Sequence, residues 1–256
     1  MKKPVNQKVR RRLLALMWAV WVIGVYLISA VVAVSVNIYI RGRLGNSASD
    51  YSIYIELGSL LVQLLIATKI IITVPYLVGR HRSDTPARRR AQKMRLLGIV
   101  RLPEKKDIWP VIGAVVVYHL AAVAILGIAN FLINPSILNR SRYTGFHVAS
   151  TNGVEIVSLI IVLAIVTPIL VEIIFRGFLY GKLESLVSRT ANTVIVTLVY
   201  MVTFGAFVDV LNALVVSLIA CYLRRKTKSL WAGIGMHMVV NLVAVVTVYV
   251  LPLFSL

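Results

Sequence analysis

The sequence predicts an all-α fold, a polytopic transmembrane helical bundle of about seven spans. The first reason is composition, since 59% of the 256 residues are hydrophobic, whereas soluble domains are about 45–50% apolar. The second is that several apolar runs approach or exceed the ~20 residues that a helix needs to cross a bilayer. Inside lipid the backbone must satisfy its own hydrogen bonds, which favours helices over an open sheet.

The expected spans follow the apolar runs at residues 13–40, 53–78, 109–133, 154–175, 192–208, 209–223 and 229–253. The fifth and sixth are short for a full crossing, so the boundary between them stays open. The first run follows a basic start similar to that of a signal peptide. It continues past residue 35, too long for a cleaved apolar segment, so we expect a retained span. Two regions are expected, N-terminal spans with a basic cytoplasmic loop over 1–153 and core spans over 154–256.

Positive charge is unevenly distributed along the chain. The formal net charge is +19, and 23 of the 28 Lys and Arg lie in segments 1–12, 79–106, 176–189 and 224–228. Loops on the cytoplasmic side of membrane proteins carry an excess of Lys and Arg. We therefore expect these segments and the N-terminus to lie in the cytoplasm, in a multi-pass protein of the cell membrane. A short chain with such a basic loop favours a prokaryotic source.

The basic segment 79–106 has two interpretations. It is either a nucleic-acid or lipid-binding patch or a topology signal. A loop between two spans is where the positive-inside rule puts such charge, so the topology signal is favoured and no nucleic-acid partner is expected. Contact with the lipid bilayer and with anionic lipid headgroups follows from either interpretation. The single cysteine, Cys221, has no partner for an internal disulfide and no metal-type spacing.

Polar residues within the spans are the candidates for function, because they are costly in lipid and usually face the bundle interior or water. They are Glu56, Lys69, His119, Glu155, Glu172, Arg176, Asp209, His237 and Asn241. Glu56 and Glu155 lie near the outer ends of their spans, where a side chain reaches water. Lys69 is expected to snorkel toward the inner face, and the isolated His119 to be packed and hydrogen-bonded.

Two pairs have the spacing i, i+4, which places both side chains on one face of a helix. His237 and Asn241 follow Gly233 and could hold a metal, a water or an oxyanion, or could join two helices by hydrogen bonds. Glu172 and Arg176 stand in the favourable order for an ion pair, which also has a purely structural explanation.

Pro168 lies four residues before Glu172 and should kink that span. A kink at the level of a buried charge suggests a cavity.

These residues together resemble a known family. VEIIFRGFLYGKL, residues 171–183, is similar to the first motif, EExxxR, of the CPBP family of CAAX-protease and bacteriocin-processing membrane proteins, also called Abi proteins. The second motif of that family, FxxxH, aligns with FGAFV at 204–208, and GMHMVVN at 235–241 supplies the third, HxxxN. The resemblance covers roughly residues 154–245, with Pro168 upstream of the first motif and SLW shortly before the last histidine.

The resemblance implies intramembrane endopeptidase chemistry, including removal of the last three residues of prenylated CAAX proteins. In such enzymes the first motif glutamate activates a water, the motif-two histidine assists, and the last histidine and asparagine bind or polarise the reacting groups. Here the first glutamate position is Val171 and the histidine position is Val208. Glu172 and Asp209 each follow one residue later, and one residue turns a helical side chain by about 100°. We therefore expect neither acid to face the reacting groups.

The residues that keep the motif pattern are Glu172, Arg176, Phe204, His237 and Asn241. Three functions compete. The favoured one is a catalytically impaired member, a membrane scaffold or partner-binding protein related to immunity or processing, without a cofactor. The second is an active endopeptidase with a site rebuilt from Glu172, Asp209, His237 and Asn241. In it His237 is the candidate ligand for a divalent metal such as zinc, which usually takes three protein ligands.

The third function is a small transporter that uses Glu56, Lys69 and Asp209 as its pathway charges. No internal repeat supports it. The sequence leaves open the substrate or partner, metal dependence and oligomeric state.

Overall fold

The computed structural model describes residues 7–78, 85, 87–88, 91, 94, 101–132, 153–204 and 207–250. This part of the chain is helical and contains no strand, which confirms the all-α fold class. The α-helices are α1 (Gln7–Leu44), α2 (Ser52–Val78), α4 (Ile108–Leu132), α6 (Gly153–Leu159), α7 (Thr167–Glu172), α8 (Tyr180–Leu183), α9 (Arg189–Met201), α10 (Phe207–Thr227) and α11 (Leu230–Val245). Short 3-10 helices are η1 (Gly45–Ala48) and η2 (Lys105–Asp107), and π-helical segments are η3 (Ile160–Val166), η4 (Ile173–Leu179) and η5 (Val246–Val250).

Five helical stretches of the described chain are long and apolar enough to cross a membrane: Gln7–Ala48, Ser52–Val78, Lys105–Ile125, Gly153–Leu183 and Leu230–Tyr249. The chain is therefore a multi-pass membrane protein with five to seven spans. The range depends on the expected spans five and six, which are not among these five stretches. Helix α9 has 13 residues, about 20 Å of helix, which is short of the ~30 Å hydrocarbon layer.

The boundary between spans five and six, which the sequence left open, does not fall at 208/209. Helix α9 ends at Met201 and α10 begins at Phe207. Val208 and Asp209 therefore both belong to the first turn of α10. Phe204, which the sequence placed within span five, follows the end of α9 and lies outside it.

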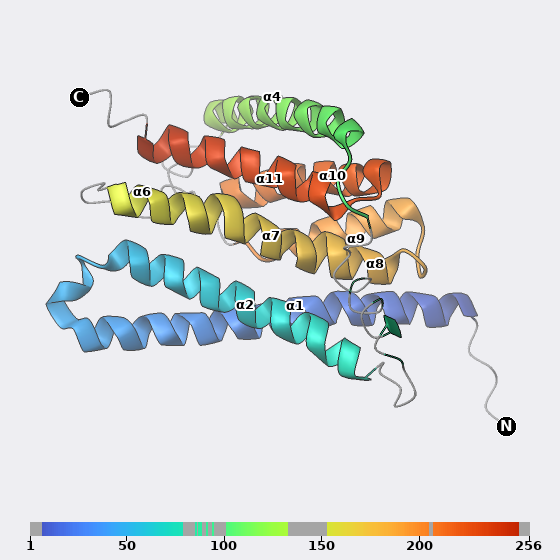
Figure 1. Cartoon of the computed structure of the whole chain (residues 1–256), viewed down its shortest axis with the longest axis horizontal. Helices are drawn as coiled ribbons and strands as arrows, with labels where there is room; N and C mark the ends of the chain where they lie inside the picture. The colour runs from blue at the N-terminus through green and yellow to red at the C-terminus, as the bar shows by residue number, and fades with distance from the viewer. Residues whose placement is uncertain are drawn as a thin grey trace.

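The helices run roughly side by side along the bundle (Figure 1). Helices α1 and α2 form an antiparallel hairpin joined through η1. The segment from α6 to α8 is one long helix, called here the motif helix (Gly153–Leu183), and it contacts α2 on one side and α11 on the other. Helix α4 covers α10 and α11 from outside. The motif helix thus lies in the centre of the bundle.

Aromatic side chains hold the second half of the motif helix against α1 and α9. The Phe175 ring centroid lies 4.9 Å from that of Tyr200 on α9 and 6.2 Å from that of Tyr26 on α1. Phe178 meets Trp18 of α1 edge to face at 5.5 Å. Phe175 and Phe178 are almost fully buried, so these contacts fix the rotation of the motif helix.

The start of α1, the turn between α8 and α9, and the turn between α10 and α11 lie at the same end of the bundle (Figure 1). Arg101, which precedes α4, binds the turn between α10 and α11. Its guanidinium donates to the carbonyl oxygen of Thr227 and pairs with Glu104 at 2.7 Å and Asp107 at 3.2 Å. Ser229 Oγ in turn donates to the Arg101 carbonyl at 3.2 Å. The described basic segments therefore gather at one end, which we call the basic end.

Candidate functional site

The motif helix continues through Pro168 with a π-helical segment on each side, η3 before and η4 after. Proline has no N–H for the carbonyl four residues earlier, and its ring crowds that carbonyl. A π-helical turn is one of the known ways in which a helix accommodates such a disturbance, and such turns are frequent at functional sites. The disturbance expected at Pro168 therefore takes the form of widened turns.

Val171 and Glu172, at the end of α7, face different surroundings. Val171 lines a pocket in the centre of the bundle, the central pocket, whereas Glu172 is not among the residues that line it. Glu172 is fully buried, with 0% of its surface exposed. At the pocket-facing position the chain thus has an apolar side chain, and its carboxylate lies behind the pocket wall.

Glu172 holds two partners with a single oxygen. Its Oε1 lies 3.2 Å from Nη1 of Arg176 and 3.2 Å from Nδ1 of His237 on α11. The last span therefore approaches the motif helix at Glu172, as the motif spacing predicts. Because a carboxylate accepts, Nδ1 of His237 carries the proton, and the other ring nitrogen is left for the central pocket.

The other oxygen, Oε2, packs against the backbone of α11 at Gly233. A Cβ at position 233 would lie 2.9 Å from Oε2 and 3.6 Å from the carboxyl carbon of Glu172. Glu172 is held by Arg176 and His237, so it has little freedom to move aside. The close approach of the two helices therefore requires glycine at this position.

Gly233→Ala should destabilise the protein by about 1–3 kcal/mol, because the added methyl overpacks against a pinned side chain. Gly235→Ala is the matched control two residues away, since a Cβ there meets nothing within 4 Å. It should be neutral or stabilising by up to ~1 kcal/mol, because alanine favours helix over glycine. Thermal unfolding in detergent micelles measures both. Equal shifts for the two variants would contradict the tight contact.

Arg176 is 1% exposed and its charge is compensated within the bundle. Besides Glu172, its guanidinium carbon lies 4.7 Å from the centre of the Tyr200 ring, and the thiol of Cys221 lies beside it. An unpaired guanidinium in this position would be very costly. The Glu172–Arg176 pair is thus a structural element of the core, and Cys221 is part of its surroundings.

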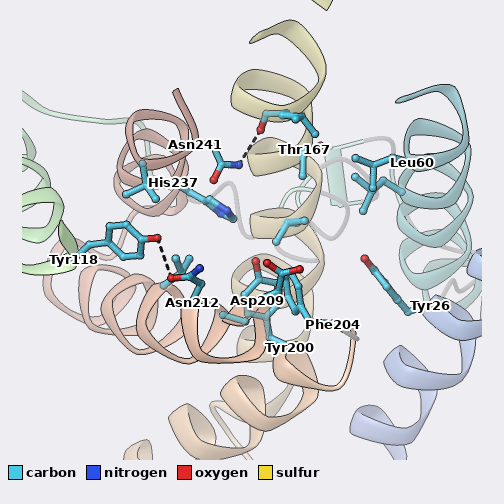
Figure 2. A pocket seen from close by; sticks show the side chains of 16 residues that line it. Tyr26, Leu60, Tyr118, Thr167, Tyr200, Phe204, Asp209, Asn212, His237 and Asn241 are labelled. Carbon is cyan, nitrogen blue, oxygen red and sulfur yellow. Dashed lines mark hydrogen bonds between the residues drawn. The ribbon is translucent and has the colours of Figure 1, made fainter. Parts of the chain in front are cut away.

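The central pocket offers about 60 Å³ to the centres of water-sized molecules, enough for a few waters. Its polar lining includes Asp209 and Asn212 of α10, His237 and Asn241 of α11, and Tyr118 of α4. Figure 2 shows these side chains converging from three sides. A pocket with this size and lining can bind water or a single hydrogen-bonding group, such as one carbonyl or amide.

Asp209 corrects an expectation. The sequence pattern placed it one residue off the useful face, yet it is 6% exposed and lines the central pocket with His237. The prediction assumed an unbroken helix from Phe204 onward. Because α9 ends at Met201 and α10 begins at Phe207, that rotation does not apply. The side chain of Val208 lies outside the described part of the chain, as does Gly205.

Asn241 lies one turn after His237 and binds the motif helix at a second point. Its Nδ2 donates to the carbonyl oxygen of Leu163 at 2.8 Å. Leu163 belongs to the π-helical segment η3, and Asn241 also lines the central pocket. The sequence left open whether His237 and Asn241 join two helices or face a binding site. They do both, since they contact the motif helix and also line a polar pocket.

Sequence reasoning missed several polar lining residues, among them Asn212 and Tyr118. Tyr118 donates its hydroxyl hydrogen to Oδ1 of Asn212 at 3.5 Å. Asn212 lies three residues after Asp209 on the same helix, so the sequence could have predicted that both side chains share one face. Tyr118 has no such signal, because its position depends on how α4 packs against α10.

The remaining candidates lie outside the central pocket. Glu56 pairs with Arg41 at 3.2 Å, and His119 contacts the backbone of its own helix with Nδ1 2.8 Å from Val115 O. Lys69 is exposed. Glu155 was expected to reach water near a span end but is buried, with 9% exposed.

Phe204 retains the place of the motif phenylalanine and lines the central pocket. Its ring centroid lies 5.0 Å from that of Tyr200, which stacks on Arg176. Phe204 thereby links the pocket wall to the buried ion pair.

A metal does not fit the described residues. No three His, Cys, Asp or Glu side chains within the described ranges lie close enough together to hold a metal ion. Glu172 already contacts Arg176 and His237. The position beside it that lines the pocket is Val171, which has no carboxylate for a metal. We derive no metal-dependent step from this site.

Comparison with known proteins is consistent with the geometry. Residues 153–243 match the family model described as type II CAAX prenyl endopeptidase Rce1-like. This part of the chain is similar to an Rce1-like domain. This confirms the resemblance to CAAX-protease-like proteins inferred from the motifs. No curated protein and no solved structure matches the chain. The matched region starts with α6 and ends within α11, so it contains Val171, Asp209 and His237, and it leaves α1, α2 and α4 outside.

Proposed function

We propose that this protein is a membrane-embedded, Rce1-like protein that has lost endopeptidase turnover and binds a membrane partner through its central pocket. The supporting observation is that Val171 faces the pocket, while the Glu172 carboxylate lies behind the wall and is neutralised by Arg176. A general base must come within hydrogen-bond reach of the water that it activates. Neither residue meets that need. The partner is a peptide or protein segment, in line with a role in immunity or processing.

Turnover is tested with the full-length protein in lipid nanodiscs and a prenylated peptide that ends in a CAAX sequence. Wild type, Asp209→Asn and His237→Ala should release the C-terminal tripeptide at the same background rate, because no positioned base is lost in either variant. Thermal unfolding verifies that the variants are folded. Cleavage by wild type that Asp209→Asn abolishes would contradict the proposal.

Partner binding is tested with a photo-crosslinking amino acid at two adjacent positions of α11. Val240 lines the central pocket, whereas Val239 is 40% exposed on the outer surface. A protein or peptide adduct should form in cells from position 240 and not from position 239. Adducts from 239 alone would show that partners contact the outside of the bundle instead of the pocket.

A second function has one observation in its favour. Asp209 and His237 line the same pocket, and Glu172 orients His237 through Nδ1. In an active enzyme Asp209 would take a proton from a water that attacks the scissile carbonyl, and His237 would hold the developing oxyanion or the leaving group. The Asp209→Asn assay distinguishes this function from the first, since a base commonly contributes about 10²–10⁴-fold.

We also propose that the basic end lies in the cytoplasm, as the positive-inside rule requires, and that the loop 79–106 contacts anionic headgroups there. Cys221 is fully buried, so introduced cysteines can be labelled selectively. Lys105→Cys at the basic end should resist a membrane-impermeant maleimide in intact cells. Asn46→Cys is exposed in η1, in the turn between α1 and α2, and that turn lies at the opposite end of the bundle (Figure 1), so it should react. The reverse pattern would invert the topology.

A further inference from the structure

Helix α4 is the span that contributes least to the interior of the bundle. Of its most apolar window, 6% is buried, compared with 33–44% in the other four candidate spans. A groove of about 550 Å³ runs between α4 and α10, lined chiefly by apolar side chains that include Trp109, Val117 and Leu218. Their exposed fractions are 76%, 56% and 44%. Because α4 spans the membrane, this α4–α10 groove opens to the hydrocarbon layer.

A basic pocket of about 270 Å³ lies where α10 ends, next to the start of α9. Four cations line it, Arg189, Arg225, Lys226 and Lys228, against one acid, Glu184. Among the described residues, none of these four cations lies within 4.0 Å of a carboxylate oxygen. The pocket therefore has an excess of positive charge suited to an anion.

The α4–α10 groove and the basic pocket meet at two shared residues, Tyr222 and Lys226. Lys226 Nζ lies 5.6 Å from the centre of the Tyr222 ring. Tyrosine and tryptophan are enriched at the level of lipid headgroups, and Trp109 at the start of α4 and Tyr222 near the end of α10 mark that level here. An apolar channel thus leads directly into a cationic pocket at the membrane surface.

We infer that this composite site binds one anionic phospholipid from the leaflet at the basic end. An acyl chain occupies the α4–α10 groove, and the headgroup phosphate lies among Arg225, Lys226 and Lys228. Basic pockets between spans bind phosphate-bearing headgroups in this way. The composite site shares no lining residue with the central pocket, so it holds whether or not the central pocket is catalytic.

Native mass spectrometry of the full chain tests this in micelles containing equal amounts of phosphatidylglycerol and phosphatidylcholine with identical acyl chains. One phosphatidylglycerol should be retained in preference to phosphatidylcholine. Replacing three cations, Arg225→Gln, Lys226→Gln and Lys228→Gln together, should reduce that preference by about tenfold or more. Gly113→Leu should lower retention of the same lipid without altering charge, since position 113 lines the groove and a Cβ there meets nothing within 4 Å.

The matched control removes three cations at the other side of the basic end, Lys8→Gln, Arg11→Gln and Arg12→Gln, and should leave the preference unchanged. An equal loss in this control would show general surface electrostatics and overturn the site. Equal retention of the two lipids by wild type would do the same. If Gly113→Leu has no effect and inorganic phosphate alone displaces the lipid, the pocket binds a free anion and the lipid inference is wrong.

Discussion

Glu172→Ala is expected to lower the free energy of unfolding by about 3–5 kcal/mol, because it leaves a buried guanidinium without its counter-charge. Arg176 is 1% exposed, and Oε1 of Glu172 is its only carboxylate contact in the described part of the chain. The same variant removes the acceptor for Nδ1 of His237. Thermal or SDS-induced unfolding in micelles, followed by circular dichroism, measures the loss.

Two further variants separate charge pairing from packing. Glu172→Gln keeps the shape and can still accept from His237, so it should cost less than Glu172→Ala. The double variant Glu172→Met, Arg176→Met removes both charges and should recover most of the stability, because apolar replacement of a whole buried pair is often neutral. If the double variant is as unstable as the sum of its single variants, the two residues are not coupled.

Much of this core could be predicted from sequence. Hydropathy indicates the spans, and the i, i+4 spacings of Glu172 with Arg176 and of His237 with Asn241 indicate which side chains share a helix face. The approach of His237 to Glu172 follows from the motifs and from Gly233. These features depend on local periodicity and on residues that are costly in lipid, which is why the sequence reveals them.

The features that were missed depend on interruptions of ideal helices. Pro168 indicates a disturbed helix in the sequence, but it does not reveal that the disturbance takes the form of π-helical segments on both sides. The break between Met201 and Phe207 changes which face of α10 turns inward. That break brings Asp209 and Asn212 to the central pocket. A prediction that assigns 3.6 residues to every turn therefore finds the right residues but the wrong rotations.

The largest expected effect on activity comes from restoring the motif. Val171 faces the central pocket, so Val171→Glu should place a carboxylate there, near His237. Val208→His adds the imidazole of the second motif on the first turn of α10. A general base and its helper commonly contribute about 10²–10⁴-fold each. The double variant should therefore gain hydrolysis of a prenylated CAAX peptide, and each single variant should gain less than the double variant.

The decisive measurement is the rate of tripeptide release by Val171→Glu, Val208→His compared with Val171→Gln, Val208→His, both folded and in nanodiscs. The glutamine variant matches the size and hydrogen bonding of the glutamate but has no base. If turnover was lost because position 171 is valine, the glutamate variant should release the tripeptide at least about 10²-fold faster than the glutamine variant. Wild type should show no release above background. Equal rates for the two folded variants, or wild-type cleavage that matches the glutamate variant, would contradict it.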